Sequence, residues 1–265
     1  MAQHLSTLFS SLENIKKTTE LDEKYKISEL TLAQQRELIV SVFDPFETPA
    51  KLGIAFNNII NSCVETTDGT NKDITIVEKP MLLRALRDLT IGDKFTKKVI
   101  DDEGNEKTEN YQFNTLNPKA FHKIKKEKEI RLDGVIKITL CAPTLSRDTE
   151  VNKTIIQKIN NYRRNIESRR HQPDPGEIAA QYLICELTKY IKSIQINEEI
   201  FNFTDLIVDE QIKVINSLPQ EHINKITDFI EEVKKGEELA FTATNLEIGK
   251  QEKISIEHNI FSKEL

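Results

Sequence analysis

The spacing of apolar residues changes along this chain, and that change limits the fold more than any other feature. In residues 50–64 the apolar side chains recur at intervals of three and four, as on the buried face of a helix. In residues 130–140 they occupy every second position, as on a half-buried strand. Helical spacing returns in residues 150–168 and 177–194. The pattern predicts a helical protein with a β insertion.

Turn-forming and capping residues place the remaining elements. Pro45 ends a helix predicted over residues 32–43, and Gly92 ends one over residues 81–89. Thr204 is the predicted N-cap of a helix that stops before Pro219, and Gly236 is the predicted end of the next helix. The further predicted strands are residues 94–99, 111–113, 239–244 and 253–256.

These elements predict a mainly α (α+β) fold, a multi-helix body with small antiparallel β hairpins that form a ribbon-like module. Residues 1–27 are expected to be an N-terminal amphipathic helix or arm, with residues 16–26 as its linker. Residues 28–236 are expected to be the helical body, with a β hairpin inserted at about 94–140. Residues 237–265 are expected to be a C-terminal β hairpin that packs on the inserted one.

Charge and cysteine content limit the class of protein. The chain has 37 basic and 43 acidic side chains, and the net charge of −6 favours solubility and disfavours general nucleic-acid binding. No apolar run reaches the roughly 18 residues that span a bilayer. Cys63, Cys141 and Cys185 are odd in number and far apart, which argues against a disulfide framework. We therefore expect a soluble intracellular protein without membrane partners.

The residues that usually carry chemistry are scattered. The chain has no closely spaced glycines for a phosphate-binding loop, and its five histidines are isolated from one another. We therefore expect no catalytic residue, no cofactor, no metal ligand and no enzymatic activity. The densest basic cluster consists of Arg163, Arg164, Arg169 and Arg170. These cations suit a helix C-terminus, and the alternatives are contact with an acidic protein surface or with phosphate.

Two apolar segments are candidate partner-binding sites. Leu5, Leu8, Phe9 and Leu12 form the stripe of a short helix that must dock on its own domain or on a second protein. Phe43 and Phe46 flank a rigid turn, where they either bind a partner or cap the local core.

Four segments, in this order, carry a resemblance to a known family. They are residues 30–38 with 55–63, residues 81–93, residues 142–145, and residues 191–194 with 203–206 and 215–219. The most characteristic is L-R-x-x-T-x-G-D, here Leu86-Arg87 followed by Thr90 and Gly92-Asp93. Together they resemble the base plate protein family of T4-like bacteriophages, to which baseplate hub assembly proteins belong.

The resemblance implies a non-enzymatic factor that binds phage baseplate hub and tail proteins in the host cytoplasm. A structural subunit retained in the virion tail baseplate is the close alternative. A nucleic-acid-associated protein that uses the arginine cluster is a second alternative, and a homo-oligomer stays open.

Many members of the family carry Cys-x-x-Cys pairs in their hairpins. The corresponding residues 97–102 and 241–244 contain no cysteine, so a metal site is not carried over to this chain. If the two hairpins pair, side chains must hold them together. The candidates are Phe95, Val99, Tyr111, Phe241 and Ile254.

Overall fold

The computed structural model describes residues 16–41, 48–67, 74–100, 104–132, 135–168, 174–256 and 259–265. In chain order the elements are β1 (Thr18–Leu21), β2 (Tyr25–Ser28), α2 (Leu32–Val40), α3 (Thr48–Cys63), β3 (Val64–Thr66), α4 (Lys79–Ile91), β4 (Lys94–Ile100), β5 (Glu106–Phe113), α5 (Pro118–Phe121), β6 (Glu127–Arg131), β7 (Ile136–Cys141), α6 (Leu145–Ser168), α7 (Pro175–Thr188), β8 (Ile191–Ile196), β9 (Glu199–Asn202), the 3-10 helix η2 (Phe203–Asp205), α8 (Val208–Ser217), α9 (Gln220–Ala240), β10 (Thr242–Asn245) and β11 (Gln251–Lys253).

Sheets contribute more to the structure than the sequence suggested. Helices hold 50% of the described residues and strands 25%, so the chain is mixed α+β and the expected mainly helical class understates its sheets. The sheets are antiparallel, with strand orders β1-β2-β3, β11-β10-β5-β4 and β6-β7-β8-β9.

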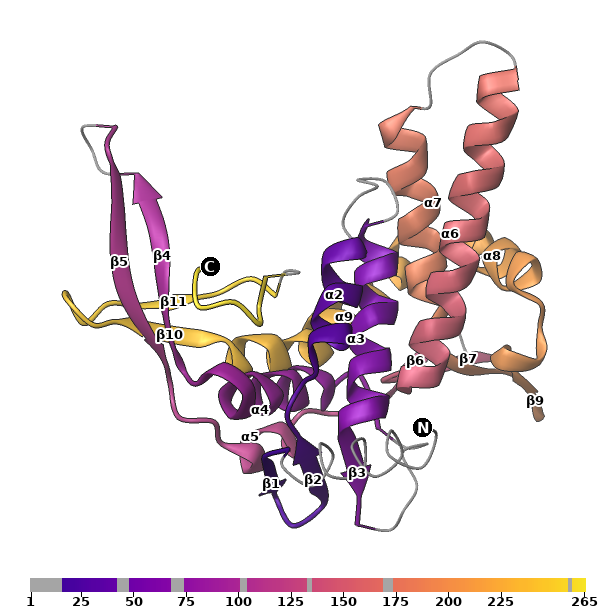
Figure 1. Cartoon of the computed structure of the whole chain (residues 1–265). Helices are drawn as coiled ribbons and strands as arrows, with labels where there is room; N and C mark the ends of the chain where they lie inside the picture. The colour runs from indigo at the N-terminus through magenta and orange to yellow at the C-terminus, as the bar shows by residue number, and fades with distance from the viewer. Residues whose placement is uncertain are drawn as a thin grey trace, which may run out of the picture.

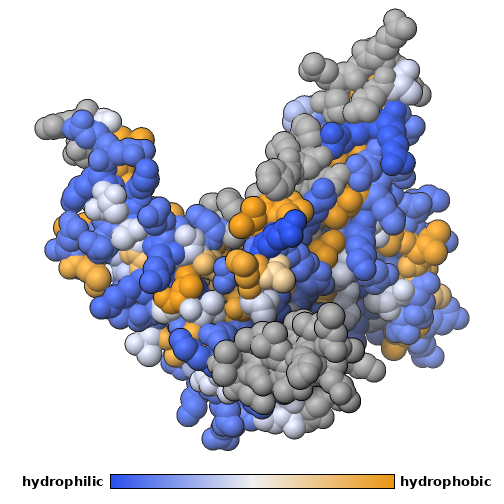
Figure 2. All heavy atoms as spheres, viewed as in Figure 1, coloured by the Kyte–Doolittle hydropathy of each residue, from blue (hydrophilic) through white to orange (hydrophobic). Residues whose placement is uncertain are grey.

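Two hairpins extend from a common base of helices. One is the β4–β5 ribbon, and the other is the helical pair α6 and α7 (Figure 1). The space-filling view shows a wide hollow between them (Figure 2). Two of the three clusters of buried apolar side chains lie around α4, α9 and the sheets that pack on them, and the third lies between α6, α7 and the start of α3.

Helix α4 is the most enclosed helix of the base. Its residues from Pro80 to Arg87 are all buried, and it contacts α3, α9 and β2. Pro80 fits the first turn, which has no intrahelical partner for a backbone N–H. Gly92 takes the left-handed φ of 89° that ends the helix and turns the chain into β4. Because α4 is enclosed, its two buried arginines need partners inside the protein.

The segments near residues 100 and 250 form one sheet. Strand β10 pairs with β5, with Ala243 opposite Phe113. Phe113 packs on Phe95 with ring centroids 4.6 Å apart and meets Phe241 edge-on at 5.8 Å. Tyr111 and Ile254 are buried in the same cluster, whereas Val99 is only half-buried and lies outside it. Aromatic packing therefore holds the two segments together.

The N-terminal linker prediction is wrong in part. Within residues 16–26, β1 and the start of β2 form an antiparallel hairpin that continues to Ser28. Tyr25 and Ile27 are buried on either side of the exposed Lys26, so only two apolar positions mark the strand. Such a short alternation is hard to recognise in a polar segment.

The strand predicted over residues 130–140 is a hairpin. Strand β6 ends at Arg131, β7 begins at Ile136, and Ile130 pairs with Ile138. Because Ile130 and its partner Ile138 are an even number of positions apart, even-numbered residues lie on the same face of both strands, and the twofold alternation continues from β6 into β7. The periodicity identified the buried face correctly but concealed the turn.

Two predicted helix boundaries in the second half of the chain are wrong. The helix predicted to reach residue 194 ends at Thr188, and strand β8 follows. The prediction ran too far because Leu187, Ile191 and Ile194 are spaced as they would be on a helix. The segment predicted to open a helix at Thr204 is the 3-10 helix η2, and α8 starts at Val208.

Gly236 lies inside α9 instead of ending it. A Cβ atom at this position would stand 3.0 Å from the backbone oxygen of Val77 and 3.5 Å from the Phe121 ring. The glycine therefore permits close packing of α9 on its neighbours and does not terminate the helix.

Candidate functional site

The L-R-x-x-T-x-G-D segment is part of the buried interior of the fold. The Arg87 side chain is fully buried and donates from Nε to the Ile260 carbonyl at 2.8 Å, from Nη2 to Ser262 at 3.1 Å, and from Nη1 to Gly92. Its guanidinium lies over the Phe113 ring, 4.9 Å from the centroid. One side chain thus fixes the C-terminal segment against α4.

Arg84 has a parallel role one helical turn earlier. Its Nη1 donates to the carbonyls of Ala240 at 2.9 Å and Asn114 at 3.2 Å, and its Nε donates to Asp88 at 2.8 Å. Its guanidinium lies 4.4 Å from the centroid of Phe113. The arginine therefore joins the end of α9 to the end of β5.

The remaining motif residues also make structural contacts. The Thr90 hydroxyl donates to the Leu86 carbonyl at 2.8 Å and accepts from the Leu30 N–H at 3.2 Å. The Asp93 carboxylate accepts from the Gln112 amide at 2.7 Å. The motif thus organises the junction of α2, α4 and the β ribbon.

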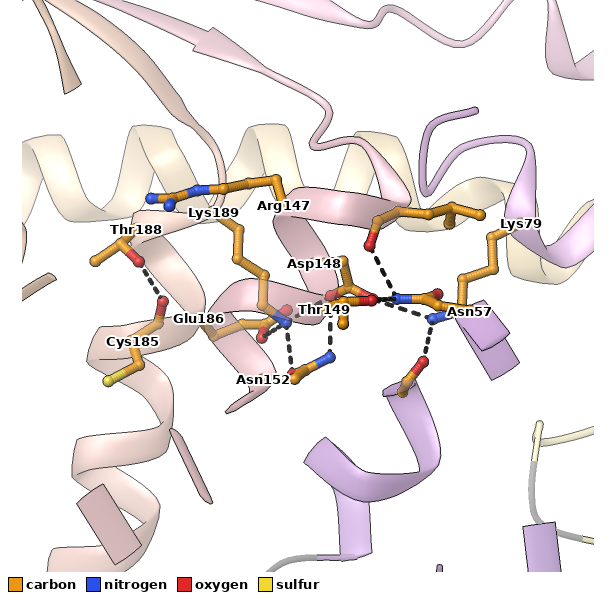
Figure 3. A network of polar contacts seen from close by, with 12 residues as sticks. Asn57, Lys79, Arg147, Asp148, Thr149, Asn152, Cys185, Glu186, Thr188 and Lys189 are labelled. Carbon is orange, nitrogen blue, oxygen red and sulfur yellow. Dashed lines mark hydrogen bonds and ion pairs between the residues drawn. The ribbon is translucent and has the colours of Figure 1, made fainter. Parts of the chain in front are cut away.

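A second buried polar cluster is centred on Asp148, in the first turn of α6 (Figure 3). One carboxylate oxygen lies 2.7 Å from Lys189 Nζ, and the other lies 3.2 Å from Lys79 Nζ and accepts from Asn57 at 2.8 Å. Asn152 donates to the first oxygen and accepts from Lys189 at 3.0 Å. The cluster links α3, α4, α6 and the end of α7.

The charges of this cluster stabilise one another. Burial alone would raise the pKa of Asp148, but Lys79 and Lys189 outweigh it and hold that pKa well below its usual range. Burial would lower the pKa of Lys189, yet Glu186 and Asp148 raise it overall. Asp148 therefore stays ionised at neutral pH and acts as a fixed counterion. A cavity of about 300 Å³ lies beside it, between α3, α4 and α9.

Glu78, at the start of α4, is the third buried polar centre. Its Oε1 accepts from the Tyr25 hydroxyl at 2.9 Å and lies 3.0 Å from Lys24 Nζ and 3.1 Å from Lys126 Nζ. Its Oε2 accepts from the N–H and the hydroxyl of Thr75, each at 2.9 Å. Burial opposes ionisation, but these donors and cations lower the pKa of Glu78 to about 2.

Replacement of Glu78 by glutamine is expected to weaken the acid sensitivity of folding. In the wild type the unfolded chain takes up a proton at about pH 4.3, whereas folded Glu78 resists protonation down to about pH 2. Its contribution is therefore complete above about pH 5 and is lost as the pH falls to about 2. In Glu78→Gln the acid-side drop in unfolding free energy should be smaller by about 2–3 kcal/mol.

Urea unfolding of both proteins across this pH range measures the difference. Glu65→Gln, on the exposed face of β3, is the matched control and should retain the full drop. An unchanged drop in Glu78→Gln would contradict the assignment.

Of the sequence-predicted site residues, only Arg163 and Arg164 lie within the described structure. Both are on α6, in the α6–α7 hairpin, and Arg164 is exposed. The others lie outside the described residues and keep the status of predictions: Leu5, Leu8, Phe9, Leu12, Phe43, Phe46, Arg169 and Arg170.

An exposed apolar surface around β9 was missed by the sequence reasoning. Its largest exposed side chains are Ile200 (65% exposed), Phe201 (47%) and Ile207 (66%). Beside them a groove of about 350 Å³ lies between the β6-β7-β8 face and α8. The alternation of Ile194, Gln195 and Ile196 signals the strand, but the predicted helix over this segment concealed it.

In the described part of the chain, no helix is long and apolar enough to span a membrane. Nor do the described histidines, cysteines and acidic residues form a group of three or more that could hold a metal ion.

A comparison with family models identifies the chain. The model described as "T4 bacteriophage base plate protein" matches residues 12–260. Searches of curated proteins and of solved structures gave no match. The matched span includes both buried arginines, the Asp148 cluster and the β9 surface. The chain therefore belongs to the T4 bacteriophage base plate protein family.

Proposed function

We propose that the protein is a non-enzymatic assembly factor of the baseplate hub that acts in the host cytoplasm by binding hub subunits. Family membership gives a structural or assembly role in the phage baseplate, with other baseplate or tail proteins as partners. The proposal narrows that role to the hub and to protein–protein binding.

The observation that carries the binding role is the exposed apolar surface around β9. Large apolar side chains exposed together beside an apolar groove are typical of surfaces that bind other proteins. The three buried polar centres, which are the arginine motif of α4, the Asp148 cluster and Glu78, support the non-enzymatic part of the proposal. Their carboxylates and guanidiniums are occupied by contacts that hold the fold together.

An affinity purification from infected cells tests the proposal. The tagged protein is expected to bring down hub subunits, identified by mass spectrometry, against a tag-only control with the same washes. Purified virions are analysed in parallel. Absence of the protein from virions is expected for an assembly factor, whereas stoichiometric presence would make it a retained structural subunit. Purification without any baseplate or tail protein would contradict the proposal.

A further inference from the structure

Strand β9 has an open edge. It is the last strand of the β6-β7-β8-β9 sheet, and its pairing partner is β8. A two-residue loop joins the strands, with Asn197 at a left-handed φ of 55°, so that Ile196 and Glu199 are the closing pair. Backbone groups alternate in direction along an antiparallel strand. The N–H and C=O groups of Ile200 and the N–H of Asn202 therefore point away from β8, whereas the Asn202 C=O begins η2 as its N-cap.

Two other sheet edges, those of β6 and β4, are protected against strand addition. Strand β6, at the opposite edge of the same sheet, carries Glu127, Lys128 and Glu129 in ion pairs. Strand β4 carries three lysines, and its residue Thr96 bridges to Glu264. Charged side chains and covering segments of this kind prevent unwanted pairing. Strand β9 has no basic residue and no proline, and it exposes Ile200 and Phe201.

The apolar groove continues onto this edge. Phe201 pairs with Ile194, which lines the groove, so both side chains lie on the same face of the sheet. Glu199 pairs with Ile196 and lies on that face too. Ile200 points to the opposite face. Figure 1 places β9 at the outer rim of the molecule.

The charges around the edge select the partner. Glu198, Glu199 and Asp205 are exposed, and within the described structure none of the three forms an ion pair. Self-pairing of β9 would gather the acidic side chains of two copies along one short edge that has no basic residue to neutralise them. A basic strand is therefore favoured over a second copy.

We infer that β9 accepts an extended, basic and apolar segment of another protein as a fifth strand of this sheet. In antiparallel pairing, apolar residues of that segment lie opposite Phe201 and Ile200, and basic residues lie opposite Glu199 and Glu198. Backbone hydrogen bonds supply affinity, and the side chains supply selectivity. Only the assignment of the segment to a baseplate protein rests on the proposed function.

A synthetic peptide tests the inference on the purified full chain. The probe is Ser-Thr-Val-Ile-Lys-Lys-Ser with blocked ends and a fluorescent label, and its binding is measured by anisotropy. We expect a dissociation constant on the order of 0.1 mM, and this constant should increase with added salt because salt screens the charge pairs. Proline in place of the probe's isoleucine removes the N–H that pairs with Ile200. That peptide should bind at least tenfold more weakly, as should a probe with glutamate in place of lysine.

Variants of the protein locate the binding site. Glu198→Lys with Glu199→Lys is expected to weaken binding at least tenfold, and so is Phe201→Ser. Glu231→Lys with Glu238→Lys, on the exposed surface of α9, changes the net charge equally and should leave binding unchanged.

Three results would overturn the inference: no binding of the probe to the wild type, equal binding of the proline peptide, or equal weakening by the α9 control. Self-association of the wild type that Phe201→Ser abolishes, measured by sedimentation, would assign the edge to a second copy. Failure of the peptide to bind leaves the proposed hub role standing, because the affinity purification tests that role without reference to β9.

Discussion

Replacement of Arg87 by alanine is expected to lower the free energy of unfolding by about 3–5 kcal/mol. The change removes the donors to the carbonyls of Ile260, Ser262 and Gly92, which then remain buried without a partner. It also removes a cation packed on Phe113 and leaves a cavity in an enclosed part of the core. Chemical denaturation of the purified protein measures the loss.

Two further variants separate the causes. Arg87→Lys keeps the charge but not the planar fork of donors, so it cannot reach all three carbonyls and should lose about 2 kcal/mol. Arg36→Ala, on the exposed face of α2, should change stability by less than about 0.5 kcal/mol. If Arg87→Ala and Arg36→Ala have similar free energies of unfolding, the structural role assigned to the motif is wrong.

Replacement of Asp148 by asparagine is expected to cost about 3–5 kcal/mol, although the two side chains have nearly the same shape. The variant leaves the buried ammonium group of Lys189 with Glu186 as its remaining acidic partner and removes the counterion of the half-buried Lys79. Thermal and urea unfolding at neutral pH measure the effect. Asp228→Asn, exposed on α9, is the matched control and should be nearly neutral.

A double variant tests whether the loss comes from charge burial. In Asp148→Asn with Lys189→Met the buried cation that lost Asp148 is gone, so part of the lost stability should return. If the double variant loses more stability than the two single variants lose together, burial of an unpaired charge is not the cause of the loss.

Local patterns predicted the parts of the fold that depend on one face of one element. Helix α3 spans Thr48–Cys63, close to the predicted residues 50–64, because its apolar spacing persists over several turns. The buried positions of the β6–β7 hairpin were also correct. In both cases the information lies within a few residues of where it is used.

Features that depend on distant contacts were not predictable in this way. Strand β8 is a strand because β7 pairs with it, although its apolar spacing also fits a helix. The family motif drew attention to Arg87, but two of its three acceptors lie 173 and 175 residues further along the chain. The open edge of β9 appears only once the strand order of its sheet is known.

The sequence separation between Arg87 and its C-terminal acceptors also determines when these hydrogen bonds can form during synthesis. A ribosome that adds about 5–20 residues per second makes α4 long before it makes Ile260, 173 residues later. For roughly nine to thirty-five seconds the nascent chain carries Arg84 and Arg87 before their acceptors in the C-terminal part of the chain have been made. The base of the molecule therefore closes late, and protection by cellular chaperones matters most during that interval.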